Sequence, residues 1–494
     1  MRNAAWVALF LVLSMVGLLL AQAPPATPVD KPTVKPVAKP ADKPAAKPAD
    51  KPPAKPADKP QAKPADKFFV GPPDRPAVKQ EPLDPRAVKL IEQLGDDDYR
   101  QRDAAHKALE AMGAKAISAL RKAKDHSDPE ICRRVAVLLP MLEHAAMVAP
   151  KRVTMNLSKK PLKQILDELT KQTGYKIQSW GGDDKKVYDL KCDNVPFWEA
   201  FDRLSQAAGL VLQPSYGDEY LRLNQQGSYV PYIKHDGAFR LVASNFNHNK
   251  TVELSTLPNT GGGAQRSESL TFTFSIFSEP KLPLMGVGEP RVTVALDNEN
   301  RSMLPVQGNN DAMGGPFGRR IGGFYGYRSY FQQTSLNLRR PAETSKSVKL
   351  LKGTVALTLL ADQKPMVVTD NILKAKGKKD TVGKTTFDIQ DVTVTPNKQY
   401  QIKMSVSEDN KDTPQDYTWM NSLYNRLHLE DDKGNKYQVF MSSWGSSGPN
   451  HVQLTFTYRA PPLAKAGPPT KLIYDLWTLV PHVVKFEFKD LPLP

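Results

Sequence analysis

The sequence predicts a multidomain α+β fold, with a helical cap, a small βαββαβ domain and all-β sandwich domains in that order. Helix-capping signals recur between residues 84 and 149, and a strand–helix pattern occurs twice between residues 150 and 228. Period-two alternation of apolar residues then dominates the rest of the chain. A chain of 494 residues exceeds what one hydrophobic core usually organises, so we expect several domains.

Residues 1–23 have the pattern of a signal peptide. Arg2 supplies a positive charge, Ala4–Leu20 is almost wholly apolar, and Ala21-Gln22-Ala23 has the small-x-small pattern of a cleavage site. Because Pro24 follows that site directly, an uncleaved anchor is the alternative, and Ala4–Ala23 gives about the 20 residues that a membrane span needs. Both interpretations predict an exported chain in the periplasm or cell envelope, and the second tethers it to the inner membrane.

Residues 24–83 are rich in Lys and Pro and predict an extended linker without a core. A Lys-Pro-Ala-Asp unit starts at Lys39 and recurs at Lys47, Lys55 and Lys63. Prolines favour polyproline II, and the composition cannot bury enough apolar surface to fold. The net charge of the chain is +16, and its basic excess favours anionic partners such as wall polymers. Nucleic acid is not expected, because no motif that reads it accompanies the charge.

Residues 84–149 read as helices. Asp84-Pro85 and Asp128-Pro129 are N-cap and N1 signatures, and Gly95 and Gly113 are placed as helix stops. Two apolar stripes match at an offset of 44 residues: Val88, Ile91 and Leu94, then Cys132, Val135 and Leu138. These paired helices resemble a HEAT repeat, of which about one and a half copies are present. The resemblance implies either a concave peptide-binding surface or an adaptor that packs against its neighbour.

Residues 150–228 contain one pattern twice. Pro161, Leu162, Leu166, Asp167, Leu169 and Gly174 recur 35 residues later as Pro196, Phe197, Phe201, Asp202, Leu204 and Gly209. Each helix is expected to start at its proline and to stop at its glycine. The segments TMNLSKKPLKQILDELTKQTGYKI and YDLKCDNVPFWEAFDRLSQAAGLVL resemble the secretin and TonB short N-terminal domain. That resemblance implies a periplasmic α+β module that docks other proteins, partly through exposed strand edges.

Residues 229–345 and 346–494 are predicted to form two β-sandwich domains. Strands with one apolar face are clear at Phe272/Phe274/Ile276 and at Val484/Phe486/Phe488. The segments VTVALDNENRSML and RLHLEDDKGNKYQV share a strand, an acidic turn and a returning strand, which indicates a duplication. Residues 306–332 join Gly with aromatic residues and predict a mobile exposed loop, or else a contact site for glycan or protein.

Residues that carry chemistry are scattered through the sequence. No metalloprotease, nucleophile-elbow or phosphate-loop motif occurs, and the eight His stand singly. Asp297/Glu299 and Glu430/Asp431/Asp432 fit hairpin turns, with calcium ligation as the alternative. Cys132 and Cys192 fall in different domains, which favours two unpaired thiols over a disulfide. The sequence thus predicts no catalytic residue, metal ligand or cofactor and assigns no binding residue.

From these patterns we expect a non-enzymatic, exported cell-envelope protein that binds other proteins or anionic wall polymers. Two alternatives follow from the same features. One is an accessory component of a secretion system or a TonB-dependent uptake system, because no pore or barrel pattern follows the module. The other is a hydrolase of envelope polymers whose site matches no known motif.

Overall fold

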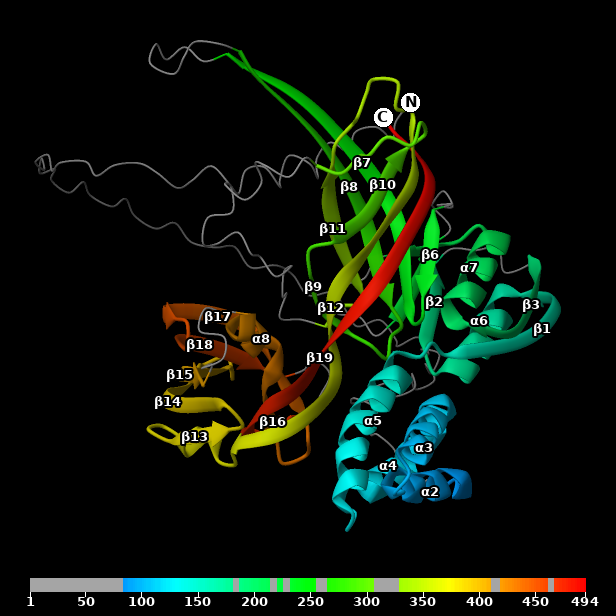
Figure 1. The fold of residues 1–494 in the computed structure, drawn as a ribbon. Coiled ribbons are helices and arrows are strands. Elements are labelled where there is room, and N and C mark those ends of the chain that lie inside the picture. Colours follow the sequence, from blue (N-terminus) through cyan, green and yellow to red (C-terminus); the bar gives the residue numbers. More distant parts are fainter. Residues whose placement is uncertain are drawn as a thin grey trace, which may run out of the picture. The chain divides into compact units, whose positions relative to one another are not determined.

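The computed structural model describes residues 83–180, 186–213, 220–224, 232–254, 264–305, 328–409, 418–460 and 466–494. This part of the chain has a mixed α+β fold that is mostly β and contains several sheets (Figure 1). The predicted signal and linker, and residues 306–327 of the predicted loop, lie outside the described residues. None of the described helices combines the length and the apolar character that crossing a membrane requires.

The helical segment consists of α2 (Pro85–Glu92), α3 (Tyr99–Met112), α4 (Ala114–Lys122) and α5 (Pro129–Val148). The Asp84 carboxylate accepts the backbone N–H of Arg86, and Asp128 accepts that of Glu130, so both predicted N-caps are confirmed. Gly113 ends α3 with a φ of 59°. Gly95 ends the short 3-10 turn Gln93–Gly95 that follows α2.

The apolar stripes of α2 and α5 start one residue earlier than predicted. Ala87 and Ile131 are buried, whereas the side chain of Val88 is 40% exposed and that of Cys132 is only partly buried. Ile91, Leu94, Val135 and Leu138 are buried as expected. The buried positions are therefore separated by four and then three residues, which is the helical spacing that places three side chains on one face.

The α/β module contains β1 (Arg152–Pro161), α6 (Leu162–Thr173), β2 (Lys176–Trp180), β3 (Val187–Pro196), α7 (Phe197–Ala208), β4 (Val211–Gln213) and β5 (Tyr220–Asn224). β1 pairs antiparallel with β3, and β5 lies between β2 and β4. Pro161 and Pro196 are the N-caps rather than the first helical residues. Gly174 and Gly209 end the helices in the left-handed conformation, as predicted.

The first β-rich region has two sheets that face one core. One sheet has the order β11-β8-β7-β6 and consists of β6 (Ile233–Asp236), β7 (Phe239–Leu254), β8 (Ala264–Ser278) and β11 (Phe331–Leu338). The facing strands are β9 (Leu284–Val287), β10 (Arg291–Asp297), the first half of β12 (Ser347–Thr369) and the second half of β19 (Pro469–Pro492). Phe272, Phe274, Val355 and Phe486 are buried together in this core.

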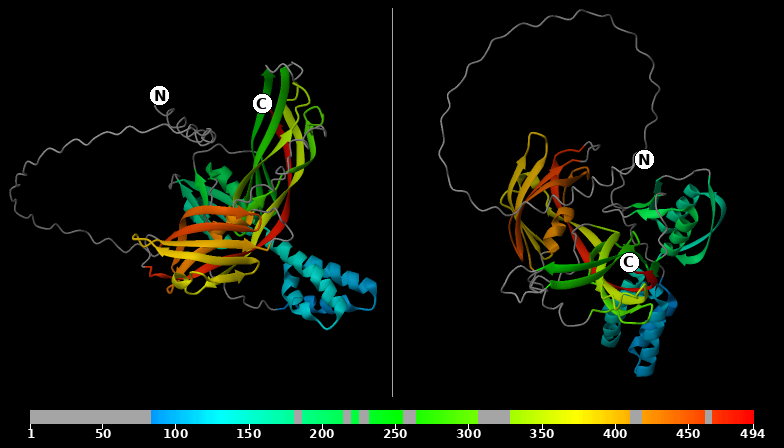
Figure 2. Two further views of the ribbon diagram at one scale, coloured as in Figure 1. Left: turned by 90° about the vertical axis from the view of Figure 1, so that its left-hand side faces the viewer. Right: turned by 90° about the horizontal axis from the view of Figure 1, so that it is seen from above.

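The second β-rich region surrounds a separate core. It contains β13 (Lys379–Val382), β14 (Thr385–Val394), β15 (Tyr400–Glu408), α8 (Thr418–Arg426), β16 (Leu427–Asp431), β17 (Lys436–Gly448) and β18 (His451–Arg459). The second half of β12 and the first half of β19 complete it, so these two strands are shared by both regions (Figures 1 and 2). All of these strands belong to one continuous ten-stranded sheet.

The predicted domain boundary at 345/346 does not separate the two cores. Val484, Phe486 and Phe488 follow that boundary in sequence but are buried in the first core. The reason is the antiparallel pairing of β12 and β19 from Ser347↔Pro492 to Thr369↔Leu472. Because both strands run through both regions, the end of the chain returns to the first one.

The two β-rich regions repeat one topology. The order β11-β8-β7-β6 in the first matches β18-β15-β14-β13 in the second. A bulge interrupts β7–β8 after Ala243 and β14–β15 after Ile389, at matching places in the ladders. The hairpins β6–β7 and β13–β14 each begin their two-residue turn with a glycine at positive φ, Gly237 and Gly383.

Candidate functional site

The α/β module is packed onto the first β-rich region through α7. Trp198 is fully buried, and its indole Nε1–H donates to the carbonyl of Ala238 at 3.1 Å. Phe277 on β8 lies in the same core as Trp198, with ring centroids 6.3 Å apart. Phe331 on β11 also belongs to this core and lies 5.0 Å from Phe277. One face of the module is therefore covered by the first β-rich region of the same chain.

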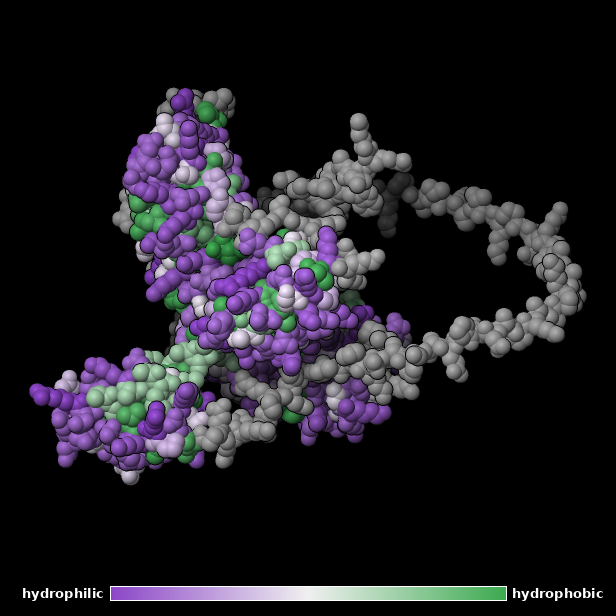
Figure 3. Space-filling view, turned by 90° about the vertical axis from the view of Figure 1, so that its right-hand side faces the viewer, coloured by the Kyte–Doolittle hydropathy of each residue, from purple (hydrophilic) through white to green (hydrophobic). Residues whose placement is uncertain are grey.

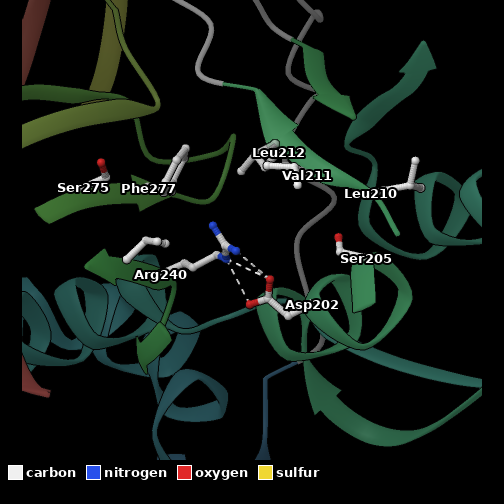
Figure 4. A pocket seen from close by; sticks show the side chains of 9 residues that line it. Asp202, Ser205, Leu210, Val211, Leu212, Arg240, Ser275 and Phe277 are labelled. Atoms are coloured by element: carbon white, nitrogen blue, oxygen red, sulfur yellow. Dashed lines mark hydrogen bonds and ion pairs between the residues drawn. The ribbon is translucent and has the colours of Figure 1, made fainter. Parts of the chain in front are cut away.

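A buried ion pair crosses this junction. The Asp202 carboxylate on α7 accepts from the Arg240 guanidinium at 2.8–2.9 Å (Figure 4). It also accepts from Nε2 of His235 at 2.8 Å. Burial by itself would raise the pKa of Asp202, but the hydrogen bond from His235 and the charge of Arg240 outweigh it and lower the pKa. The carboxylate is thus held ionised, and the pair links α7 to β7.

A second polar contact lies at the start of the module. Glu279 is fully buried and accepts the hydroxyl of Tyr175 at 2.6 Å and the backbone N–H of Lys151 at 3.1 Å. Burial raises the pKa of Glu279, and these hydrogen bonds only partly offset that effect. The junction therefore carries two buried carboxylates whose pKa values move in opposite directions.

The second β-rich region shows why the module packs on the first alone. Arg240↔Phe277 and Val242↔Ser275 in the β7–β8 ladder correspond to Thr386↔Ser407 and Asp388↔Ser405 in the β14–β15 ladder. Val242 and Phe277 are buried under the module, whereas Asp388 and Ser407 are accessible to solvent. The positions of Val242 and Phe277, which are apolar where the module covers them, are thus polar in the other repeat.

The surface of the module away from this junction is basic. Four lysines have exposed side chains here. Lys159 and Lys160 lie near the end of β1, Lys163 lies in the first turn of α6, and Lys191 lies on β3. Register places Lys160 opposite Tyr188 near one end of the β1–β3 ladder, and Lys191 opposite Asn156 near its middle. Asp189 lies among them and accepts from Ser158 and from the backbone of Lys159. Positive charge predominates on this face, which suits an anionic partner.

The two predicted carboxylate clusters form matching turns. Asp297 accepts the backbone N–H groups of Glu299 and Arg301 at 2.8–2.9 Å, and Asp431 accepts those of Lys433 and Asn435 at the same distances. The hydroxyl of Ser345 reaches the second oxygen of Asp297, and the N–H of Gly467 reaches that of Asp431. Burial alone would raise the pKa of each, but the hydrogen bonds outweigh it and hold both at about 2. N–H and O–H donors therefore occupy the carboxylate oxygens that calcium ligation would use.

Glu299, Glu430 and Asp432 do not join Asp297 or Asp431 in a metal site. Among the described residues, no group of three or more His, Cys, Asp or Glu is arranged to hold a metal ion. Glu299 pairs with Arg301 at 3.0 Å, and Glu430 accepts from His428 at 3.2 Å. Cys132 and Cys192 are both free thiols, and Cys192 is buried in the core of the module.

Folding brings together histidines that the sequence shows only singly. His144 on α5 contacts Pro481 O at 3.2 Å, and its ring lies 5.3 Å from that of His482. His428 on β16 lies 3.7 Å from the Asp475 carboxylate on β19. Burial lowers the pKa of His428 and raises that of Asp475. These contacts join elements far apart in sequence, so no local spacing could reveal them.

The helical segment also carries exposed apolar side chains. Val137 and Met141 on α5 are 60% and 40% exposed. Figure 3 shows a largely hydrophilic surface with a pale hydrophobic band along the helical segment at the lower left. These side chains follow one another at helical spacing on one face of α5.

Comparison with known proteins gives no match. No family model, no curated protein and no solved structure matches the chain. The basic face and the junction of the module are therefore interpreted from their own residues.

Proposed function

We propose that the chain is an exported, non-enzymatic cell-envelope protein that binds an anionic wall polymer through the basic face of its α/β module. In this proposal the module is of the secretin and TonB short N-terminal type. The helical segment is a short HEAT-like adaptor, and each β-rich region is a β-sandwich. The Lys/Pro segment is a linker that follows the export signal.

The observation that carries the proposal is the way the module is held. Its α7 face is buried against β7 and β8 through Trp198, Asp202 and Arg240, while Lys160, Lys163 and Lys191 are exposed. Packing of this kind orients the lysines on a fixed support, which reduces the entropy lost when a partner is bound. Electrostatic attraction would raise the association rate with polymers that carry carboxylate or phosphate groups and would favour them over uncharged polymers.

A charge-reversal experiment tests this proposal. The triple variant Lys160→Glu, Lys163→Glu and Lys191→Glu is compared with wild type for sedimentation with purified peptidoglycan sacculi. We expect at least a tenfold weaker affinity for the variant. We also expect wild-type binding to weaken as sodium chloride rises from about 0.05 to 0.5 M, because salt screens exposed charges.

The matched control makes the same charge change elsewhere. Lys374, Lys378 and Lys379 are exposed on the second β-rich region, and replacing all three by Glu should leave binding unchanged. Equal loss in both triple variants would show a nonspecific charge effect and contradict the proposal. Wild-type affinity in the module variant would contradict it as well.

Export is tested separately. Osmotic-shock fractionation should recover the chain outside the cytoplasm, and N-terminal sequencing should begin at Pro24 if the signal is cleaved. Recovery only in the cytoplasmic fraction would overturn the assignment to the envelope.

A further inference from the structure

A cavity of about 130 Å³ lies at the junction of the α/β module with the first β-rich region. Its apolar walls come from residues 210–212 at β4 and from the ring of Phe277 on β8 (Figure 4). Val242 on β7 also lines it. A cavity of this size is comparable to one that holds a benzene molecule, so it suits a ligand of about six non-hydrogen atoms.

Ser205 on α7 gives this cavity an unused hydrogen-bonding group. Its side chain lines the cavity and the residue is only 5% exposed. Its hydroxyl makes no hydrogen bond within the part of the chain that the structure describes. Ser275 lines the same cavity, but its hydroxyl is already paired with that of Ser244 at 3.0 Å. A buried hydroxyl without a partner costs free energy, which a bound ligand would recover.

The charges in the wall exclude ionic ligands. Asp202 and Arg240 both line the cavity and neutralise one another. A bound anion would lie near the Asp202 carboxylate, and a bound cation near the Arg240 guanidinium, each with little water to screen the repulsion. The Asp202 oxygens already accept from Arg240 and His235, which leaves them little capacity for a ligand donor.

We propose that this cavity is a binding site for a small uncharged amide. The apolar end of the ligand packs against Val242 and Phe277, and its amide group hydrogen-bonds the hydroxyl of Ser205. A hydroxyl can both donate to an amide carbonyl and accept from an amide N–H, so one side chain serves either orientation. The site is separate from the basic face, and this proposal does not depend on the function proposed for that face.

The test is a titration of the full chain with N-methylacetamide, followed through the methyl resonances of Leu210, Val211, Leu212 and Val242. We expect saturable shifts at these methyls, with a dissociation constant on the order of 1–10 mM for so small a molecule. Acetate and methylammonium, which are similar in size but charged, should give no saturable shift at the same concentrations. Absence of saturation by N-methylacetamide, or equal binding of the charged compounds, would overturn the proposal.

Two variants separate the role of Ser205 from general effects on the fold. Ser205→Ala should weaken binding roughly fivefold through the loss of one neutral hydrogen bond, while the melting temperature stays the same or rises. Ser275→Ala is the matched control, because that hydroxyl already has a partner, and should change the affinity less than twofold. Wild-type affinity in Ser205→Ala would overturn the assignment of the amide contact.

Discussion

Phe277→Ala should release the α/β module while leaving the first β-rich core in place. The Phe277 ring packs against Trp198 and Phe331, and the Arg240 guanidinium lies 5.4 Å above it. The side chain is 7% exposed, so its truncation leaves a cavity at the junction. Loss of a buried Phe costs about 4 kcal/mol. If this cost falls on the junction, opening of α7 becomes up to about a thousandfold more frequent.

Amide hydrogen exchange measured along the full chain is the assay. Ile276 is the matched control, because it precedes Phe277 on β8 but is fully buried in the first β-rich core on the other face of the sheet. Phe277→Ala should accelerate exchange mainly in α7, whereas Ile276→Ala should accelerate it mainly in β7, β8 and β12. If both variants accelerated amide exchange equally in both cores, or if exchange in α7 were unchanged in Phe277→Ala, Phe277 would not hold the module on the first β-rich region.

Three further predictions follow from buried carboxylates. Asp202→Asn should lower the free energy of unfolding of the module by about 3 kcal/mol, because it leaves Arg240 buried without its counter-charge. Asp167 is the exposed residue that corresponds to Asp202 in the first copy of the repeated pattern, and Asp167→Asn should change the free energy of unfolding by less than 0.5 kcal/mol. Equal losses of unfolding free energy for the two variants in urea titrations would contradict this. Glu279 has a raised pKa, so the stability that it contributes at low pH is lost as pH rises from about 4 through the folded-state pKa. The melting temperature of Glu279→Gln should therefore rise relative to that of wild type as the pH increases over that range. A variant that instead becomes more stable relative to wild type as the pH falls would contradict this. Asp297→Ala and Asp431→Ala should each cost about 3 kcal/mol through lost hydrogen bonds to a carboxylate, with no change in melting temperature when calcium is added. A cost confined to one of the two turns would argue against their equivalence.

Local signals in the sequence located the helices and the module well. Asp84, Asp128, Gly174 and Gly209 act where capping chemistry places them. Capping depends on a few neighbouring residues, so it can be read without the tertiary structure. The proline positions were less exact, since Pro161 and Pro196 precede the first helical turn.

Alternation in the sequence is a poorer guide to the buried face of a strand where a bulge intervenes. Val292, Val294 and Leu296 alternate as if one face of β10 were buried, but Ala295 and Asp297 are the buried residues. A bulge between Val292 and Val294 shifts the register of β10 against β12 and turns the later residues over. No residue pattern around Thr293 marks that shift.

One residue of the sequence, Phe277, points to the junction although it lies outside the alternating pattern of β8. Phe272, Phe274 and Ile276 mark one face of β8 as apolar, and Phe277 is a large apolar side chain on the opposite face. A solvent-facing strand position rarely needs such a residue, so it indicates a covering element. Asp202 was visible as part of the repeated pattern, but its pairing with Arg240 depends on packing across 38 residues of sequence.

We propose that the basic face of the module, held by its junction with the first β-rich region, contacts an anionic partner. The most direct measurement is amide exchange of the full chain with and without solubilised, protein-free peptidoglycan fragments. We expect slower exchange at the end of β1, in α6 and in β3, with residues 374–382 of the second β-rich region unchanged. Protection confined to the second β-rich region, or protection of α7 alone, would contradict it.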